Sequence, residues 1–178
     1  MAKIILFLLI SKLIFKLYIR VMKVQLWSLG KDHESYVQEG IAQFQQRLSH
    51  YCDFEIRLLQ LPKKARNEAP SETLRAEAQL VLSQLPQNDW LIALDERGKQ
   101  LDSPGWARML QQQQLSSTRR TIFLIGGAYG LDDSIRERSN QLLGLSQLTF
   151  PHQLVRLIVC EQLYRAFSIL RNEKYHHQ

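Results

Sequence analysis

The segment TIFLIGGAYG, from Thr121 to Gly130, gives the clearest indication of the fold. Five strand-forming residues come first, and glycines occupy positions 126, 127 and 130. A short apolar run of this kind is typical of a strand buried in a parallel sheet, and glycines allow the chain to turn closely after it. Asp132 then stands where a helix N-cap is expected. The stretch therefore predicts one strand, loop and helix unit of an α/β domain.

Similar units extend in both directions from this stretch. Apolar runs predict strands at 24–29, 54–58, 90–94 and 142–148, and apolar residues three or four apart predict helices at 34–50, 71–85, 105–114 and 154–170. Ser71 and Ser103 are the expected caps of the second and third of these helices, and residues 95–99 (DERGK) are expected to form a turn. Because strands and helices alternate without hairpin signals, the sequence predicts a mostly parallel sheet.

Length and composition favour one domain with a substantial core. The chain has 178 residues, of which 45% are hydrophobic and 22% charged, and this excludes disordered and collagen-like proteins. Cys52 and Cys160 lie too far apart for a disulfide framework or a zinc pattern, so a reducing compartment, the cytoplasm, is the expected location. No metal site is expected, because the adjacent His176 and His177 lack partner ligands at suitable spacing.

Residues 1–21 differ in kind from the rest of the chain. They contain an apolar run from Ile4 to Ile10 and four cations without an acid, so of the net charge of +6 only +2 belongs to residues 22–178. Lys12 and Lys16 interrupt any membrane span, and no small-residue cleavage site precedes Met22. A basic helix lying on a membrane surface is the alternative. We expect a single domain over residues 22–178, with 1–21 an extension outside the fold and no membrane attachment.

Three loops are candidate ligand-binding segments, because ligands of open α/β sheets bind beyond the carboxyl ends of the strands. These loops are 94–98, 126–130 and 145–151. The glycine loop matches neither the dinucleotide fingerprint nor the P-loop, which argues against an NAD site and an NTPase. His152 is either a general base or a surface histidine, and Arg165 either pairs with Glu161 on a solvated face or holds a phosphate in a cleft.

The expected last helix, 154–170, is apolar around most of its circumference. One sheet-facing stripe requires far fewer apolar residues than this. We therefore expect a second cover, supplied by another copy of the chain in a two-fold dimer.

Several segments carry a family resemblance. They are MKVQLWSLGK (22–31), IALDERGK (92–99), LIGGAYG (124–130), LSQLTFPHQLVRLIVCEQLYRAFSI (145–169) and the ending NEKYHHQ (172–178). Together they resemble the RlmH family of the SPOUT superfamily, whose members methylate N3 of a pseudouridine in large-subunit ribosomal RNA. The resemblance spans residues 22–178 and leaves residues 1–21 without a counterpart.

The resemblance implies a C-terminal trefoil knot, a homodimer and S-adenosylmethionine as the methyl donor. The positions that match the donor-binding residues of the family are Leu94, Gly126, Leu145, Ser146, Gln147, Leu148, Thr149 and Phe150. The candidates for holding the target base, where the tail of one subunit meets the donor pocket of the other, are His152, Arg165, Tyr175 and His176.

The implied substrate is a pseudouridine in the helix 69 loop of 23S rRNA, within the assembled large subunit or 70S ribosome. Because the domain carries a charge of only +2, we expect it to read the shape of the ribosome with help from the tail and from Lys63, Lys64 and Arg66. The candidate acceptors of the N3 proton are His152, His176 and water. If water accepts the proton, Arg165 would stabilise the anion that forms.

Two other functions stay open at this point. Ala128 and Tyr129 depart from the residue pairs expected in the glycine loop, and a bulky Tyr129 that narrowed the loop would favour a non-catalytic ribosome-binding or assembly protein of the same fold. The second alternative is a SPOUT methyltransferase that acts on another RNA, such as tRNA.

Overall fold

The computed structural model describes residues 22–30, 34–62, 69–116, 118 and 120–175. The expected extension 1–21, the cations Lys63, Lys64 and Arg66, and His176 lie outside these residues. The described strands form one sheet in the order β2-β1-β4-β3-β5, with every neighbouring pair parallel. They are β1 (Lys23–Leu29), β2 (Asp53–Leu59), β3 (Trp90–Gln100), β4 (Thr121–Ile125) and β5 (Gln141–Gly144). The predicted parallel α/β sheet is thus confirmed.

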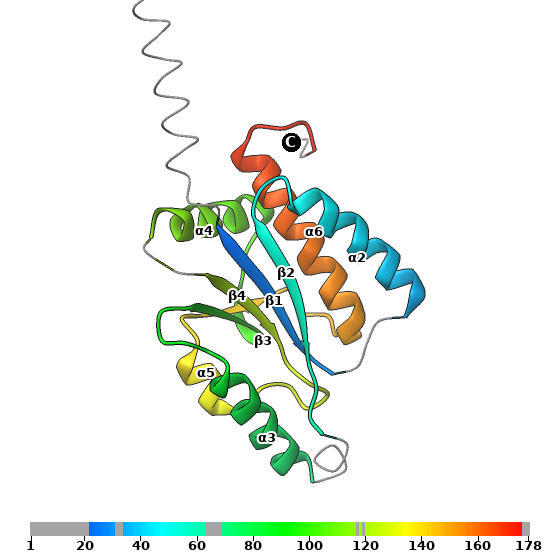
Figure 1. Cartoon of the computed structure of the whole chain (residues 1–178), viewed down its shortest axis with the longest axis vertical. Coiled ribbons are helices and arrows are strands. Elements are labelled where there is room, and N and C mark those ends of the chain that lie inside the picture. Colours follow the sequence, from blue (N-terminus) through cyan, green and yellow to red (C-terminus); the bar gives the residue numbers. More distant parts are fainter. Residues whose placement is uncertain (1–21, 31–33, 63–68, 117, 119, 176–178) are drawn as a thin grey trace, which may run out of the picture.

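Helices cover both faces of the sheet (Figure 1). Three pack on one face, namely α2 (Ser35–Leu48), α4 (Ser103–Leu115) and α6 (His152–Leu170). Two pack on the other, α3 (Pro70–Ser83) and α5 (Asp133–Arg138). None of the helices in the described residues combines the length and the apolar character that a membrane span requires.

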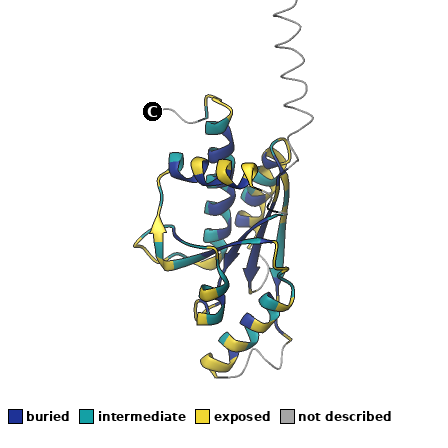
Figure 2. Cartoon of the chain, turned by 90° about the vertical axis from the view of Figure 1, so that its left-hand side faces the viewer, coloured by how far each residue is buried: buried dark blue, intermediate teal, exposed yellow. Residues whose placement is uncertain are grey.

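The two layers of helices enclose two apolar cores, one on each side of the sheet. Figure 2 shows the buried residues along the strands and on the inner surfaces of the helices. On the α6 side, Trp106 stacks on Phe123 with ring centroids 5.6 Å apart, and both side chains are almost fully buried. Each such side chain contributes about 1.5–3 kcal/mol to folding. The apolar runs that predicted the strands, such as TIFLI, therefore lie in the core.

Several expected boundaries are wrong for local reasons. The residues DERGK do not form a simple turn, because β3 continues to Gln100 and pairs again with β5 after an irregularity between Leu94 and Lys99. The expected fifth strand is shorter than predicted and ends at Gly144. Asp102, not Ser103, caps α4 by accepting the amide N–H of Gly105, and Ala69 rather than Ser71 precedes α3. Asp132 caps α5 as predicted.

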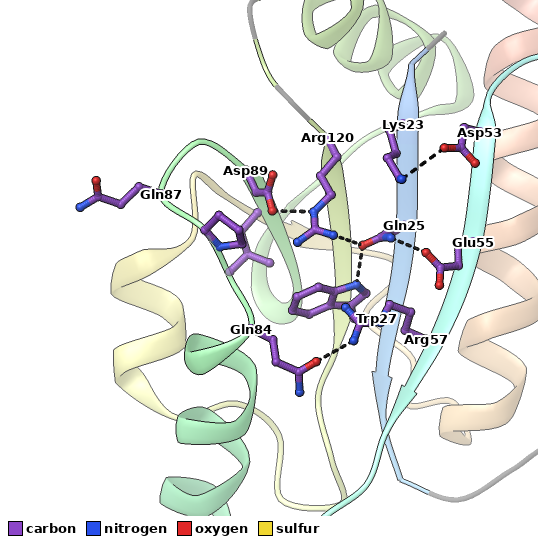
Figure 3. Close-up of polar contacts among 12 residues, drawn as sticks. Lys23, Gln25, Trp27, Asp53, Glu55, Arg57, Gln84, Gln87, Asp89 and Arg120 are labelled. Carbon is purple, nitrogen blue, oxygen red and sulfur yellow. Dashed lines mark hydrogen bonds and ion pairs between the residues drawn. The ribbon is translucent and has the colours of Figure 1, made fainter.

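A polar cluster joins β1, β2 and β4 on the α3 side of the sheet (Figure 3). The buried Trp27 indole and Arg120 Nη1 both donate to Oε1 of Gln25, each over 2.9 Å. The guanidinium groups of Arg57 and Arg120 lie 4.9 and 5.4 Å from the centre of the Trp27 ring. Arg120 also pairs with Asp89, whose side chain is fully buried, at 2.5 Å. This cluster links β1 and β2 to the residue that precedes β4.

Replacing Arg120 by methionine should lower the free energy of unfolding by about 3–5 kcal/mol, because the Asp89 carboxylate is left buried without its cation. Arg108→Met removes the exposed pair between Arg108 and Asp102 and should cost less than about 1 kcal/mol. Urea unfolding of both variants measures the difference, and equal losses would show that burial of the Asp89 pair has no energetic consequence.

Candidate functional site

The three candidate loops converge at the carboxyl edge of the sheet. Leu94 pairs with Ile125 of β4 and with Leu143 of β5. Gly126 follows the first partner directly, and Leu145 stands two residues after the second. Leu94 and Leu145 are half-buried and pack against the core. The structure therefore brings together at least one predicted donor-binding residue from each loop.

The segment after β5 contains the other predicted donor-binding residues. Ser146 Oγ accepts the amide N–H of Leu148 over 3.0 Å, which turns the chain. Gln147 and Thr149 are exposed, Phe150 is half-buried, and Leu148 is 71% exposed. An apolar side chain this exposed next to backbone amides suits the edge of a binding site for an amphipathic ligand.

The glycine loop is folded tightly back on itself. The amide N–H of Gly130 donates to the carbonyl oxygen of Gly127 over 3.1 Å, and an added Cβ at Gly126 would lie 2.5 Å from the carbonyl oxygen of Gly130. Tyr129 is 53% exposed and lies on the rim of the loop. The departure from the expected sequence at Ala128 and Tyr129 therefore leaves space beside the loop.

A cavity of about 500 Å³ fills that space, beyond the ends of β1 and β4. Its walls come from the end of β1, from α3, from the glycine loop and from the start of α6. The lining residues are Leu29, Gly30, Thr73, Glu77, Gly127, Ala128, Tyr129, Pro151, His152, Gln153 and Arg156. Such a volume suits one nucleobase with part of its sugar or a molecule of similar size.

The start of α6 gives the cavity a positive wall. Arg156 is 1% exposed, and its Nε donates to the buried Ser28 Oγ over 2.8 Å. His152 lies one turn earlier on the same helix, exposed at the cavity mouth. Burial of part of the ring and the nearby charge of Arg156 lower the pKa of His152, which favours the neutral imidazole. Both side chains are therefore positioned to contact a ligand in the cavity.

The wall of the cavity that α3 forms is acidic, because the carboxylate of Glu77 faces the glycine loop there. A Cβ at Gly127 would lie 2.5 Å from Oε2 of Glu77 and closer still to Oε1, so the absence of a side chain at Gly127 lets the carboxylate take this position. Oε2 is buried and has no hydrogen-bond partner among the described residues. Burial raises the pKa of this carboxyl group above its usual value.

A second cluster forms at the other end of α6. Arg165 Nη2 donates to Oε1 of Glu161 over 2.6 Å, and the Tyr175 hydroxyl donates to the same oxygen over 3.2 Å. The Arg165 guanidinium lies 4.7 Å from the centre of the Tyr175 ring. Burial, followed by the charge of Glu161, raises the pKa of Tyr175. The structure thus brings Arg165 and Tyr175 together, and it contains the Glu161 pair that the sequence offered as one role for Arg165.

The two clusters are separate within one chain. Arg165 follows His152 by thirteen residues on α6, which corresponds to about 20 Å along the helix. His152 therefore shares the cavity with Arg156, whereas Arg165 and Tyr175 lie far from it.

Sequence reasoning missed Arg156 and Glu77. A charged residue inside the apolar run LVRLIVC is a signal for a buried, functionally placed cation, and it was available in the sequence. Glu77 gave no comparable signal, because a glutamate beside the apolar stripe of a helix is ordinary surface composition. Only the fold shows that its carboxylate meets the glycine loop.

Other kinds of chemistry find little support in the described residues. Cys160 is buried in α6, and burial raises the pKa of its thiol to about 12, so it is a core residue and not a nucleophile. No group of three or more histidine, cysteine, aspartate or glutamate side chains is placed there to hold a metal ion.

Comparison with protein families gives a match that covers most of the chain. The family described as "Predicted SPOUT methyltransferase" matches residues 22–176. A protein of Cytophaga hutchinsonii named "Ribosomal RNA large subunit methyltransferase H" is 43% identical over 157 residues, which is 88% of this chain and 100% of that protein. A protein of Syntrophotalea carbinolica with the same name is 40% identical over the same shares of both chains.

Solved structures with a similar fold are distant in sequence. The "Probable Methyltransferase from Bordetella pertussis Tohama I" has a TM-score of 0.55 at 13% identity, covering 82% of this chain and 95% of that one. A "probable methylase family protein from Haemophilus influenzae Rd KW20" has a TM-score of 0.52 at 12% identity, covering 88% and 71%. These two structures support the fold.

The cavity environment of His152 should be measurable by NMR. We expect the imidazole pKa below 6.5 in the native protein and a rise to the ordinary value in concentrated urea. Because the unfolded chain then binds this proton more readily, the free energy of unfolding should decrease as the pH falls through 6.5, and His152→Asn should reduce that decrease. A native pKa at or above 6.5 would contradict the environment described here.

Proposed function

The chain belongs to the SPOUT methyltransferase family, and we propose that it transfers a methyl group from S-adenosylmethionine to large-subunit ribosomal RNA. The observation that carries this proposal is the convergence of Leu94, Gly126 and the segment 145–150 at one edge of a parallel sheet, beside a cavity with a buried cation. The names of the similar proteins add the class of RNA.

The residues at this edge fit the methyl donor chemically. An adenosyl group needs apolar surface for its rings and backbone groups for its polar edge. Half-buried Leu94, Leu145 and Phe150 offer the first, and the tight glycine loop with the turn at Ser146 offers the second. Leu94, Gly126, Leu145, Ser146, Gln147, Leu148, Thr149 and Phe150 would hold the donor.

The finer proposal concerns the target. By resemblance to the RlmH family, the acceptor is N3 of a pseudouridine in the helix 69 loop of 23S rRNA, on the assembled ribosome in the cytoplasm. His152, Arg165, Tyr175 and His176 are the proposed base-holding residues. The cavity beside the glycine loop has a suitable volume for the flipped base.

A two-fold dimer would bring the His152 cluster of one subunit next to the Arg165 cluster of the other. Leu154 and Ile158 are half-buried apolar residues on α6 that do not belong to either core, and they precede Arg165 along the helix. If α6 packs antiparallel to its copy through this stripe, the Arg165 and Tyr175 end of one subunit reaches the His152 end of the other. Homodimerisation and the trefoil knot remain predictions from the resemblance.

The protein has mainly to align donor and acceptor and to manage one proton. S-adenosylmethionine supplies an electrophilic methyl group when bound. Arg156 provides a fixed positive charge for the anion that forms when the base loses its proton, and its buried position strengthens this effect. Arg165 and Tyr175 orient the RNA from the partner subunit.

Two measurements test this function. Calorimetric titration of the 22–178 protein with S-adenosylmethionine should give one site per chain or per dimer, and no binding would favour a non-catalytic ribosome-binding protein. Purified protein should then label large subunits that lack the modification, with the methyl group mapped to N3 of pseudouridine by mass spectrometry. Labelling of tRNA instead would identify a SPOUT methyltransferase with another substrate.

Arg165→Ala should reduce methylation of large subunits by about 100-fold or more, because a charged contact to RNA is lost, while donor affinity stays within about twofold. The exposed Arg108, changed to alanine, serves as the control and should retain full activity. Loss of donor binding together with methylation in Arg165→Ala would contradict its assignment to the RNA side.

Mixed dimers test the shared site. A subunit with Arg165→Ala and a subunit with Gly126→Val are each expected to be inactive alone, the second because its side chain would collide with the glycine loop. Unfolding the two variants and refolding them together in equal amounts should restore up to about a quarter of wild-type activity, because half of the dimers are then mixed and each mixed dimer has one intact site out of two. Absence of any restoration would indicate that each subunit carries its own complete site.

A further inference from the structure

We infer that Glu77 is the group that accepts the imino proton of the target base during methyl transfer. This inference rests on the proposed function and specifies the chemistry of its site. It starts from two features of Glu77, namely a carboxylate oxygen that is buried without a partner among the described residues and a position in the wall of the cavity. A buried carboxylate without a partner is costly to retain, so a ligand that donates to it is the expected complement.

The position of Glu77 relative to the donor loop carries the argument. The Glu77 carboxylate lies next to Gly127, and Gly127 directly follows Gly126, a proposed donor-binding residue. Neighbouring Cα atoms are 3.8 Å apart, so the carboxylate lies within about two residue lengths of the donor loop. A base that fills the cavity with its reactive nitrogen toward the donor is therefore within reach of Glu77.

The surrounding charges suit a base that becomes an anion. The other titratable groups that line the cavity are Tyr129 from the glycine loop and His152 and Arg156 from α6. In a uracil-type ring the reactive nitrogen lies between two carbonyl groups, which carry the negative charge after the proton leaves. Arg156 can stabilise that charge, while the raised pKa of Glu77 makes its carboxylate a stronger proton acceptor than an exposed one.

The step balances without any further reactant. The imino N–H bond breaks and its proton passes to Oε2 of Glu77, as the bond between N3 and the methyl carbon forms and the bond from that carbon to sulfur breaks. The products are the methylated base, S-adenosylhomocysteine and a protonated Glu77. Release of that proton to water restores the carboxylate for the next cycle.

The decisive variant is Glu77→Gln, with Glu72→Gln as its matched control. Glu72 lies on the same helix but is exposed and outside the cavity. In single-turnover methylation of large subunits that lack the modification, Glu77→Gln should be slower by about 100-fold to 10,000-fold, and Glu72→Gln should equal the wild type. Donor affinity measured by calorimetry should stay within about twofold in both.

The pH profile separates proton transfer from a merely structural role. Near neutral pH the wild-type rate should change little, because Glu77 supplies the base. The residual rate of Glu77→Gln should rise about tenfold per pH unit, since only solution ionisation of the base then provides the anion. Glu77→Gln should also melt at the same temperature as the wild type or a few degrees higher, because a buried unpartnered charge has been removed.

Each contrary result has a definite meaning. A Glu77→Gln rate within about threefold of wild type, or a slow rate with an unchanged pH profile, overturns the inference. A tenfold loss of donor affinity assigns Glu77 to donor binding instead, and a lower melting temperature assigns it to the fold. If the wild-type protein itself methylates no RNA, the proposed function fails, and the assignment of Glu77 fails with it.

Discussion

The position of β4 between β1 and β3 determines which strand ends lie next to one another in the sheet. Thr121 pairs with Val24 on one side and with Trp90 on the other, so the three strands run in register. Their carboxyl ends therefore lie together, with Ser28 beside Ile125 and Ile125 beside Leu94. In this way Ser28 holds the buried Arg156 next to the glycine loop, and the polar cluster around Trp27 links the same strands through Gln25 and Arg120.

The helix α6 has a different role at each end and in its middle. Its first turns supply His152 and Arg156 to the cavity, its middle is buried against the sheet, and its last turns supply Arg165 to the cluster with Tyr175. A single rigid helix thus fixes the distance between two polar clusters that are otherwise unconnected. Within one subunit these clusters cannot cooperate, which is why the proposed function requires a second copy of the chain.

The sequence predicts those parts of the fold that depend on local patterns. The run TIFLI predicts a buried strand and Asp132 predicts a helix N-cap, because burial and capping each favour particular residue types. The continuation of β3 to Gln100 was not predictable, since polar residues that normally form turns are retained there by pairing with β5. The three candidate ligand-binding loops could be placed because each follows an expected strand, whereas the contact of Glu77 with Gly127 depends on how two distant segments pack.

The close fit of Glu77 against Gly127 has a consequence for how these two positions evolve. A Cβ at position 127 would displace the end of the Glu77 side chain, whereas a shorter residue at position 77 leaves glycine at position 127 undisturbed. A substitution at position 127 is therefore expected to disturb the Glu77 carboxylate less once the glutamate has been replaced by a shorter residue. Among related chains this one-sided dependence would appear as epistasis, with position 127 varying more often where position 77 has a shorter side chain.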